Sequence, residues 1–250
     1  MTNITVNSNL CNLTRLRLEG NELIKRSYQH LLQSCPLKLT DLDLAFLPIG
    51  DETLQSILSN PQYSKITRLE MRYNTNITTK SIPIIVDTLT MLRDFYLEWK
   101  LLGTEDCRYI AESPCFRNMT RLSLEYCDIG PEGVKVISSN KSKLKHLSLV
   151  GNEIGDEGCH FIATSPNMIH LETLDLDYNR ISREGCKSLA NSPFLPRLSS
   201  LHVEGNYRSC IEILELHHHF GENCKIDSEY FKEDDYDSSD EEERTESDKE

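Results

Sequence analysis

The sequence lacks the features that mark several common classes of protein. It has no run of about 20 apolar residues of the kind that spans a membrane, and its amino-terminal segment has neither the charged start nor the apolar core of a secretory signal. Lysine and arginine number 27 against 40 aspartates and glutamates, for a net charge of −13. This balance excludes a nucleic-acid binder driven by overall basic charge. We expect an intracellular chain, cytoplasmic with a nuclear location as the alternative, that binds neither membranes nor nucleic acid directly.

Common catalytic motifs are also missing. The sequence contains no G-x-x-x-x-G-K-S/T, no H-E-x-x-H and no G-x-S-x-G, the signatures of nucleotide hydrolysis, metalloproteolysis and serine hydrolysis. Its nine cysteines include no C-x-x-C pair, and without a secretory signal we expect reduced thiols. These absences predict a protein that is not an enzyme and that has no catalytic residues, no cofactor and no metal.

What the sequence does contain is an internal repeat. The pattern L-x-x-L-x-L-x-x-N/C-x-I/L returns eight times at intervals of 25 to 27 residues, which predicts stacked structural units. The middle framing residues of the eight copies are Leu16, Leu42, Leu69, Phe95, Leu122, Leu147, Leu174 and Leu201. The last two framing residues of each copy are one position apart, which is typical of a short strand with one buried face. Apolar residues at helical spacing follow, as in Val134 and Ile137.

No single unit can bury both its strand and its helix, so neighbouring units must stack. We predict an α/β solenoid with a concave parallel sheet and convex helices. The segments CDIGPEGVKVISSN, from Cys127, and NEIGDEGCHFIATSP, from Asn152, resemble the leucine-rich repeat family in its ribonuclease-inhibitor-like subtype. The resemblance extends over roughly Asn9 to Ile213 and implies a horseshoe-shaped repeat domain.

Charge is unevenly distributed along the chain. Residues 227–250 hold 13 acidic and 3 basic residues, whereas the remaining 226 residues are nearly balanced. We expect residues 1–226 to form the repeat domain, with about eight repeats and terminal caps. Residues 227–250 have too little apolar surface to order themselves and are predicted to be an acidic disordered tail. Ser238 and Ser239, each with an acid three residues on, are candidates for phosphorylation.

The repeat explains several polar residues. One asparagine position recurs, where a buried amide can bond to the backbone of adjacent turns. Its occupants are Asn21, Asn74, Asn152, Asn179 and Asn206, with Cys127 in the same position. Cys107, Cys159 and Cys186 share an inward helix position and are expected to pack as small apolar side chains.

Two groups of residues carry metal-ligating atoms without a complete set of ligands. Asp41 with Asp43, and Asp175 with Asp177, each place two carboxylates on one strand face, which could hold a cation. No further ligand is visible in the sequence. The three histidines 217–219 match no regular zinc-binding spacing. We therefore assign no metal to these residues.

The outward strand positions provide the candidate site. The residue before the asparagine position is aromatic in four consecutive units, and acidic residues dominate the position before that. Aromatic residues and arginine dominate protein interfaces, and acidic neighbours favour a partner with a basic patch. The alternative is that the aromatic side chains only stabilise the sheet. We predict a partner-binding surface that comprises Phe46, Arg72, Tyr73, Glu98, Trp99, Glu125, Tyr126, Asp177 and Tyr178.

The functional expectation is a monomeric, non-catalytic protein-protein interaction module or scaffold. One alternative is a GTPase-activating protein, because the Ran GTPase activator is similar in outline, with repeats of this subtype followed by an acidic tail. No catalytic motif shared with the Ran GTPase activator supports assigning its activity to this chain. A substrate-recognition subunit of a ubiquitin ligase is a further alternative. Acidic nuclear phosphoproteins, which combine leucine-rich repeats with an acidic tail that engages histones, provide another.

Overall fold

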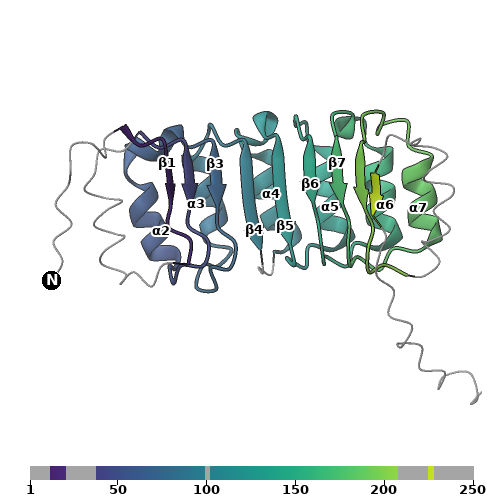
Figure 1. Cartoon of the computed structure of the whole chain (residues 1–250), viewed down its shortest axis with the longest axis horizontal. Coiled ribbons are helices and arrows are strands. Elements are labelled where there is room, and N and C mark those ends of the chain that lie inside the picture. Colours follow the sequence, from purple (N-terminus) through teal and green to yellow (C-terminus); the bar gives the residue numbers. More distant parts are fainter. Residues whose placement is uncertain (1–11, 21–37, 99–101, 208–224, 228–250) are drawn as a thin grey trace, which may run out of the picture.

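The strands form one continuous sheet. The computed structural model describes residues 12–20, 38–98, 102–207 and 225–227 of the chain, and in them nine parallel strands pair in sequence order (Figure 1). The strands are β1 (Arg15–Arg17), β2 (Asp41–Asp43), β3 (Arg68–Glu70), β4 (Asp94–Glu98), β5 (Arg121–Glu125), β6 (His146–Ser148), β7 (Thr173–Asp175), β8 (Ser200–His202) and β9 (Lys225–Asp227). The sheet is open, and its ninth strand comes from a segment without a recognisable repeat motif.

Helices form a second layer behind the sheet (Figure 1). They are α2 (Asp51–Leu58), α3 (Ser81–Thr88), α4 (Thr104–Glu112), α5 (Gly130–Ser139), α6 (Gly155–Thr164) and α7 (Arg183–Ala190). Each follows one strand of the series β2 to β7, and consecutive helices pack against each other from α2 to α7. The predicted α/β solenoid is thereby confirmed. No helix in the described ranges is both long and apolar enough to cross a membrane.

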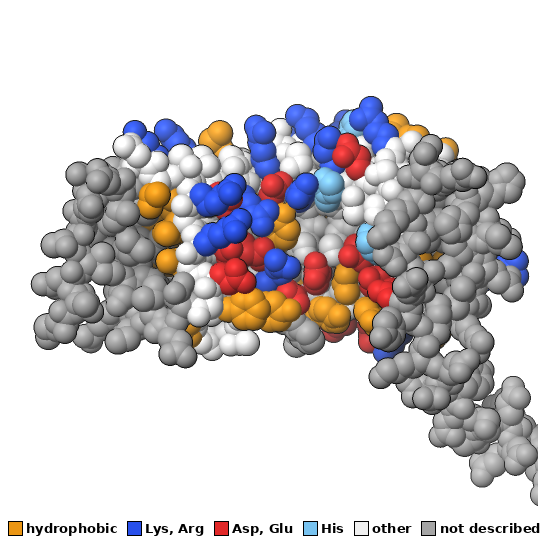
Figure 2. All heavy atoms as spheres, in the orientation of Figure 1, with side chains coloured by type: hydrophobic (Ala, Val, Ile, Leu, Met, Phe, Trp, Pro, Cys, Tyr) orange, Lys and Arg blue, Asp and Glu red, His pale blue; other side chains and the backbone are white. Residues whose placement is uncertain are grey.

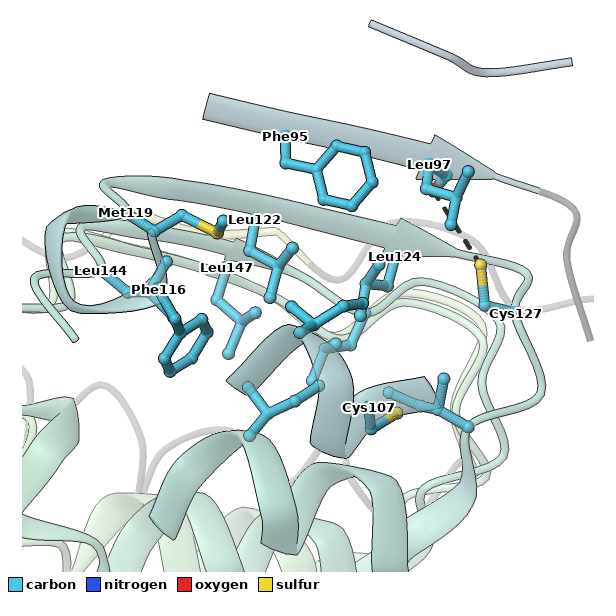
Figure 3. Packing of buried hydrophobic residues seen from close by; sticks show 14 of the residues in the cluster. Phe95, Leu97, Cys107, Phe116, Met119, Leu122, Leu124, Cys127, Leu144 and Leu147 are labelled. Carbon is cyan, nitrogen blue, oxygen red and sulfur yellow. Dashed lines mark hydrogen bonds between the residues drawn. The ribbon is translucent and has the colours of Figure 1, made fainter. Parts of the chain in front are cut away.

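The core lies between the two layers. Leu122 and Leu124 of β5 meet Val134 and Ile137 of α5, and all four are at most 1% exposed. Figure 3 shows the equivalent side chains of successive strands pointing into the same space. Full burial of such a side chain stabilises the fold by about 1.5–3 kcal/mol relative to exposure. The two periodicities of the repeat therefore identify the two faces of the core correctly.

The asparagine position forms a ladder of side-chain hydrogen bonds. Asn179 donates from Nδ2 to the carbonyls of Leu149 (2.8 Å) and Asp177 (3.0 Å), and its Oδ1 accepts from the backbone N–H groups of Asn152 (2.9 Å) and Ile154 (3.4 Å). Asn74, Asn152 and Asn206 are similarly buried and bonded. The thiol of Cys127 contacts the carbonyl of Glu125 at 3.2 Å. The prediction of a structural ladder is confirmed for these residues; Asn21 lies outside the described ranges.

The cysteines of the helix layer are buried. Cys107 and Cys159 have free thiols, as predicted, and burial raises both pKa values, that of Cys107 to about 12. Such thiols stay protonated at neutral pH and are poor nucleophiles. Cys186 is buried in the same way but is disulfide-bonded. The expectation of a reduced thiol is therefore wrong for Cys186.

An aspartate joins neighbouring helices at their amino-terminal ends. Asp51, the first residue of α2, accepts hydrogen bonds from the Thr78 N–H (2.8 Å), the Thr78 hydroxyl (2.6 Å) and the Ser81 hydroxyl (2.6 Å) near the start of α3. Burial alone would raise the pKa of Asp51, but the bonds from Ser81 and Thr78, with the charge of Lys80, outweigh it and lower the pKa. The ionised carboxylate thus stabilises the contact between two units.

We expect Asp51→Asn to lower the free energy of unfolding by about 1–2 kcal/mol at pH 7. Because the pKa of Asp51 in the folded state lies below its usual value of 3.8, this stabilisation is present above that pH and is lost as the pH falls through the folded-state pKa. Urea unfolding at pH 7 and about pH 3 measures the change. The control Glu52→Gln removes an exposed charge from the same turn. An equal loss in both variants would contradict the role of the Asp51 hydrogen bonds.

Candidate functional site

The sheet face away from the helices carries three kinds of side chain. Figure 2 shows hydrophobic side chains along one border of this face, acidic side chains beside them, and lysine and arginine toward the opposite border. The hydrophobic border includes residues of the turns that follow the strands. We call Phe46, Tyr73, Tyr126 and Tyr178 the aromatic edge. Trp99, the other predicted member of this row, lies outside the described residues, as do Ser238 and Ser239 of the acidic segment.

The aromatic edge lies in the turns that follow the strands, where the backbone is left-handed. The φ angles of Phe46, Tyr73, Tyr126 and Tyr178 lie between 51° and 59°. The chain leaves the sheet at this position, so the side chains line the carboxyl-terminal border and not the strand face that we predicted for them. The rings of Phe46 and Tyr73 stack with their centroids 4.2 Å apart and their planes at 17°. Phe46 (49%), Tyr73 (42%) and Tyr178 (51%) nevertheless remain exposed.

Glycines occupy the same position in other units for a packing reason. Gly151 and Gly205 have φ angles of 64° and 63°, and a Cβ atom on either would lie 2.4 or 2.3 Å from a ring carbon of Tyr126 or Tyr178. Each tyrosine ring therefore covers the glycine of the next unit. The sequence shows the alternation of tyrosine and glycine, but its meaning requires knowledge of which residues are neighbours across units.

An ion-pair network covers the amino-terminal half of the sheet face. Arg72 donates from Nε and Nη2 to the two carboxylate oxygens of Glu70, at 2.9 and 3.1 Å. Arg68 donates to the Tyr96 hydroxyl at 2.6 Å with its guanidinium over the Tyr96 ring, and it also lies 3.7 Å from Asp41. Burial raises the pKa of Glu70, although Arg72 opposes the shift. Arg72, a predicted contact residue, is therefore fixed in place by Glu70.

Acidic residues dominate the carboxyl-terminal half of this face. Glu125 accepts hydrogen bonds from the hydroxyls of Ser123 (2.7 Å) and Ser148 (3.1 Å), and Asp175 accepts one from the N–H of Asp177 (3.3 Å). Burial raises the pKa of Asp175; the Asp177 N–H and the charge of His202 oppose this shift, while other nearby carboxylates add to it. This half therefore offers carboxylates to a bound group.

Glu98 departs from the predicted acidic surface. It belongs to β4, beside Glu125 of β5, but only 3% of it is exposed. The strand alternation places it correctly on the outward side of the sheet without revealing this burial. Glu98 is thus hidden from a partner in the arrangement described, whereas Glu125 and Asp177 are partly exposed.

One of the two aspartate pairs acquires a third possible cation ligand. Asp175, Asp177 and His202 each offer one atom, and these atoms lie within 4.8 Å of one another. Ligands bound to one zinc ion at 2.0–2.2 Å lie at most about 4.4 Å apart, so this cluster could hold such an ion after a small side-chain adjustment. Sequence reasoning missed His202, which reaches the cluster through strand register, opposite Asp175. Asp41, which with Asp43 forms the other set of two aspartates, makes an ion pair with Arg15, with 2.7 Å between Oδ2 of Asp41 and Nε of Arg15.

A hollow of about 200 Å³ lies at the centre of the sheet face. We call it the central hollow; its lining includes Arg72, Tyr96, Arg121, Ser123, Glu125, His146, Ser148 and Asp175. Arg121 lies 3.1 Å from His146, and burial together with the Arg121 charge lowers the pKa of His146. His146 is therefore neutral at neutral pH. The central hollow combines carboxylates, hydroxyls and two arginines on a surface that no side chain of the described chain fills.

Comparison with known proteins supports the identity of the repeats. A family model described as leucine-rich repeat matches residues 117–138, 140–163 and 167–190. These segments follow one another along the solenoid and include all of α7 and all but the last residue of α5 and of α6. No curated protein matches the sequence. The matched segments of the solenoid are leucine-rich repeats, and such repeats generally serve as protein-interaction modules.

Proposed function

We propose that the chain is a non-catalytic scaffold of the ribonuclease-inhibitor-like subtype that binds a protein partner at the aromatic edge and the adjoining sheet face. The observation that carries this proposal is the exposure of Phe46, Tyr73 and Tyr178 along one border of a continuous sheet. When a partner removes large, half-exposed aromatic side chains from water, their burial lowers the free energy of the complex and so favours binding. Because these side chains recur on different repeat units, a partner can contact several units of the solenoid at once.

The charge beside the aromatic edge indicates the partner's chemistry. Glu125, Asp175, Asp177 and Glu204 lie on the strands β5, β7 and β8 or within two residues after them. The strands β6, β7 and β8 carry no lysine or arginine. The arginines of the face lie on or next to β1, β3 and β5 and partly neutralise acids there. A basic patch on the partner complements the carboxyl-terminal half, because opposite potentials favour association and orient the two proteins.

We expect the double variant Tyr73→Ala/Tyr178→Ala to lower partner affinity at least about tenfold, because aromatic residues at interfaces often contribute more than 1.4 kcal/mol each. Affinity purification with the intact chain would identify retained proteins. The affinity of each purified candidate for the wild-type chain and the variant is then measured by isothermal titration calorimetry.

The control is Tyr109→Ala, which removes a tyrosine that is 54% exposed on α4, in the helix layer. This variant should bind as the wild type does, and thermal unfolding should show that all three proteins are folded. Unchanged affinity of Tyr73→Ala/Tyr178→Ala for every purified partner would refute the proposed surface. A loss of affinity in Tyr109→Ala alone would place the binding site on the helix side.

A further inference from the structure

Strand register explains why the central hollow exists. One row across the sheet reads Tyr96, Ser123, Ser148 and Asp175 on the adjacent strands β4 to β7. Two serines therefore stand between a large aromatic residue and a carboxylate, and their short side chains leave a depression. Both serine hydroxyls donate to Oε1 of Glu125, which holds this carboxylate at the hollow.

The carboxylates of the central hollow form no close ion pair within the described part of the chain, although Arg72 and Arg121 also line the hollow and the charges of Arg72 and His202 act on Glu125 and Asp175. Neither Glu125 nor Asp175 forms an ion pair there, whereas Glu70 and Asp41 in the other half of the face pair with arginines. The serines bind one oxygen of Glu125, and the Asp177 N–H binds one oxygen of Asp175. In both carboxylates, the second oxygen accepts no hydrogen bond from a described residue. These oxygens therefore favour the binding of a positively charged group.

The spacing of the two carboxylates selects between the possible cations. Glu125 belongs to β5 and Asp175 to β7, so their strands are two strand spacings, or about 10 Å, apart, and Glu125 lies two residues further along β5 than Ser123, which shares the row of Asp175. A guanidinium is planar, carries five N–H donors and can pair with more than one acceptor at a time. The ammonium of lysine is a compact point charge, which suits a single carboxylate better. Of the two arginines that line the hollow, Arg72 is paired with Glu70 and Arg121 contacts His146, so neither forms an ion pair with Glu125 or Asp175 in the described chain.

We propose that the central hollow is a binding site for one arginine side chain of the protein partner, with the guanidinium paired to Glu125 and Asp175. The proposal rests on the proposed function, which it makes specific: the partner's basic patch presents an arginine to the middle of the sheet while apolar residues contact the aromatic edge. The site differs from the cation cluster around His202, because it uses the serine floor and Glu125.

The test uses N-acetyl-arginine N-methylamide as the probe, titrated into the full-length, isotope-labelled chain in a buffer that contains a chelator. We expect saturable shifts of the backbone amide signals of Ser123, Ser148 and Asp177, with a dissociation constant of about 1 mM. The citrulline analogue, which has the same shape but no charge, should cause no saturable shift. The lysine analogue should bind at least about threefold more weakly.

The variant Glu125→Gln/Asp175→Asn should weaken probe binding at least about tenfold, because both charge-assisted contacts are lost. The matched control Asp128→Asn/Glu132→Gln removes two exposed carboxylates near the start of α5 and should leave binding unchanged. Thermal unfolding verifies that both variants are folded. Absence of a saturable shift, equal binding of the citrulline analogue, or unchanged binding to Glu125→Gln/Asp175→Asn overturns the proposal; equal binding of the lysine analogue overturns the selection of arginine.

Failure here is distinguishable from failure of the proposed function. Tyr73→Ala/Tyr178→Ala should leave probe binding unchanged, since neither tyrosine lines the central hollow. If these tyrosines are required for partner affinity but the arginine probe does not bind, the scaffold function stands and the arginine site is wrong. If the probe binds while the tyrosine variant retains full partner affinity, the arginine site stands and the aromatic edge is not the interface.

Discussion

Asn179→Ala is expected to lower the free energy of unfolding by about 3–5 kcal/mol. Asn179 is fully buried, and its amide satisfies two backbone carbonyls and two backbone N–H groups around the turns of two adjacent units. Alanine would leave these groups without their partner in a buried environment, where each unsatisfied group costs about 1–3 kcal/mol before relaxation. Water or backbone shifts would recover part of this loss. Urea unfolding followed by circular dichroism measures the change.

Two comparisons separate the ladder from a general effect of losing an asparagine. Asn191→Ala removes an exposed asparagine whose amide bonds only to the Lys187 carbonyl, so its cost should stay below about 1 kcal/mol. Asn179→Cys should recover part of the loss, because Cys127 occupies the same position in its own unit and contacts a backbone carbonyl. If Asn179→Ala costs no more than Asn191→Ala, the ladder does not stabilise the solenoid as we infer.

Gly151→Ala is expected to cost about 2–3 kcal/mol and to displace the ring of Tyr126. The φ angle of 64° is unfavourable for alanine, and the new Cβ would lie 2.4 Å from the Tyr126 ring. Gly20→Ala is the matched control, because Gly20 holds the same repeat position at φ 63° but has no atom within 4 Å of its ideal Cβ. It should therefore cost only about 1 kcal/mol.

The difference between these glycine variants isolates the contact with the tyrosine ring. Denaturant unfolding gives both stabilities, and the near-ultraviolet circular dichroism of the tyrosines reports on the ring. In the background Tyr126→Ala, the additional cost of Gly151→Ala should fall toward that of Gly20→Ala. Equal costs for Gly151→Ala and Gly20→Ala in the wild-type background would show that the ring moves away freely.

Much of the fold can be predicted from the sequence because each unit repeats the same pattern of apolar and polar residues. The framing residues Leu122 and Leu124 alternate on a strand, Val134 and Ile137 recur at helical spacing, and all four reach the core as predicted. The asparagine ladder was predictable for the same reason. The disulfide of Cys186 was not predictable, because oxidation of a cysteine depends on a second cysteine and not on its own place in the repeat.

The candidate site was less predictable, because it depends on where strands end and on which residues meet across units. Alternation alone places Tyr73 and Tyr178 over the strand face, whereas a left-handed turn moves them to its border. The pairing of Arg68 with Tyr96 joins residues 28 positions apart, and the central hollow appears only when Ser123 and Ser148 are aligned by register. Sequence chemistry indicated which residues lie on this face and its border but not their geometry, nor the burial of Glu98.

The direction of the asparagine ladder has a consequence for the order of folding. Asn152 bonds to the turn of the preceding unit, Asn179 to that of Asn152, and Asn206 to that of Asn179. Each turn is therefore completed by a side chain that lies later in the chain, 27 residues further on in the case of Asn179. At 5–20 residues per second, the ribosome adds those residues in roughly 1–5 s. During synthesis, the most recently formed turn always has open hydrogen-bonding groups until the next unit emerges.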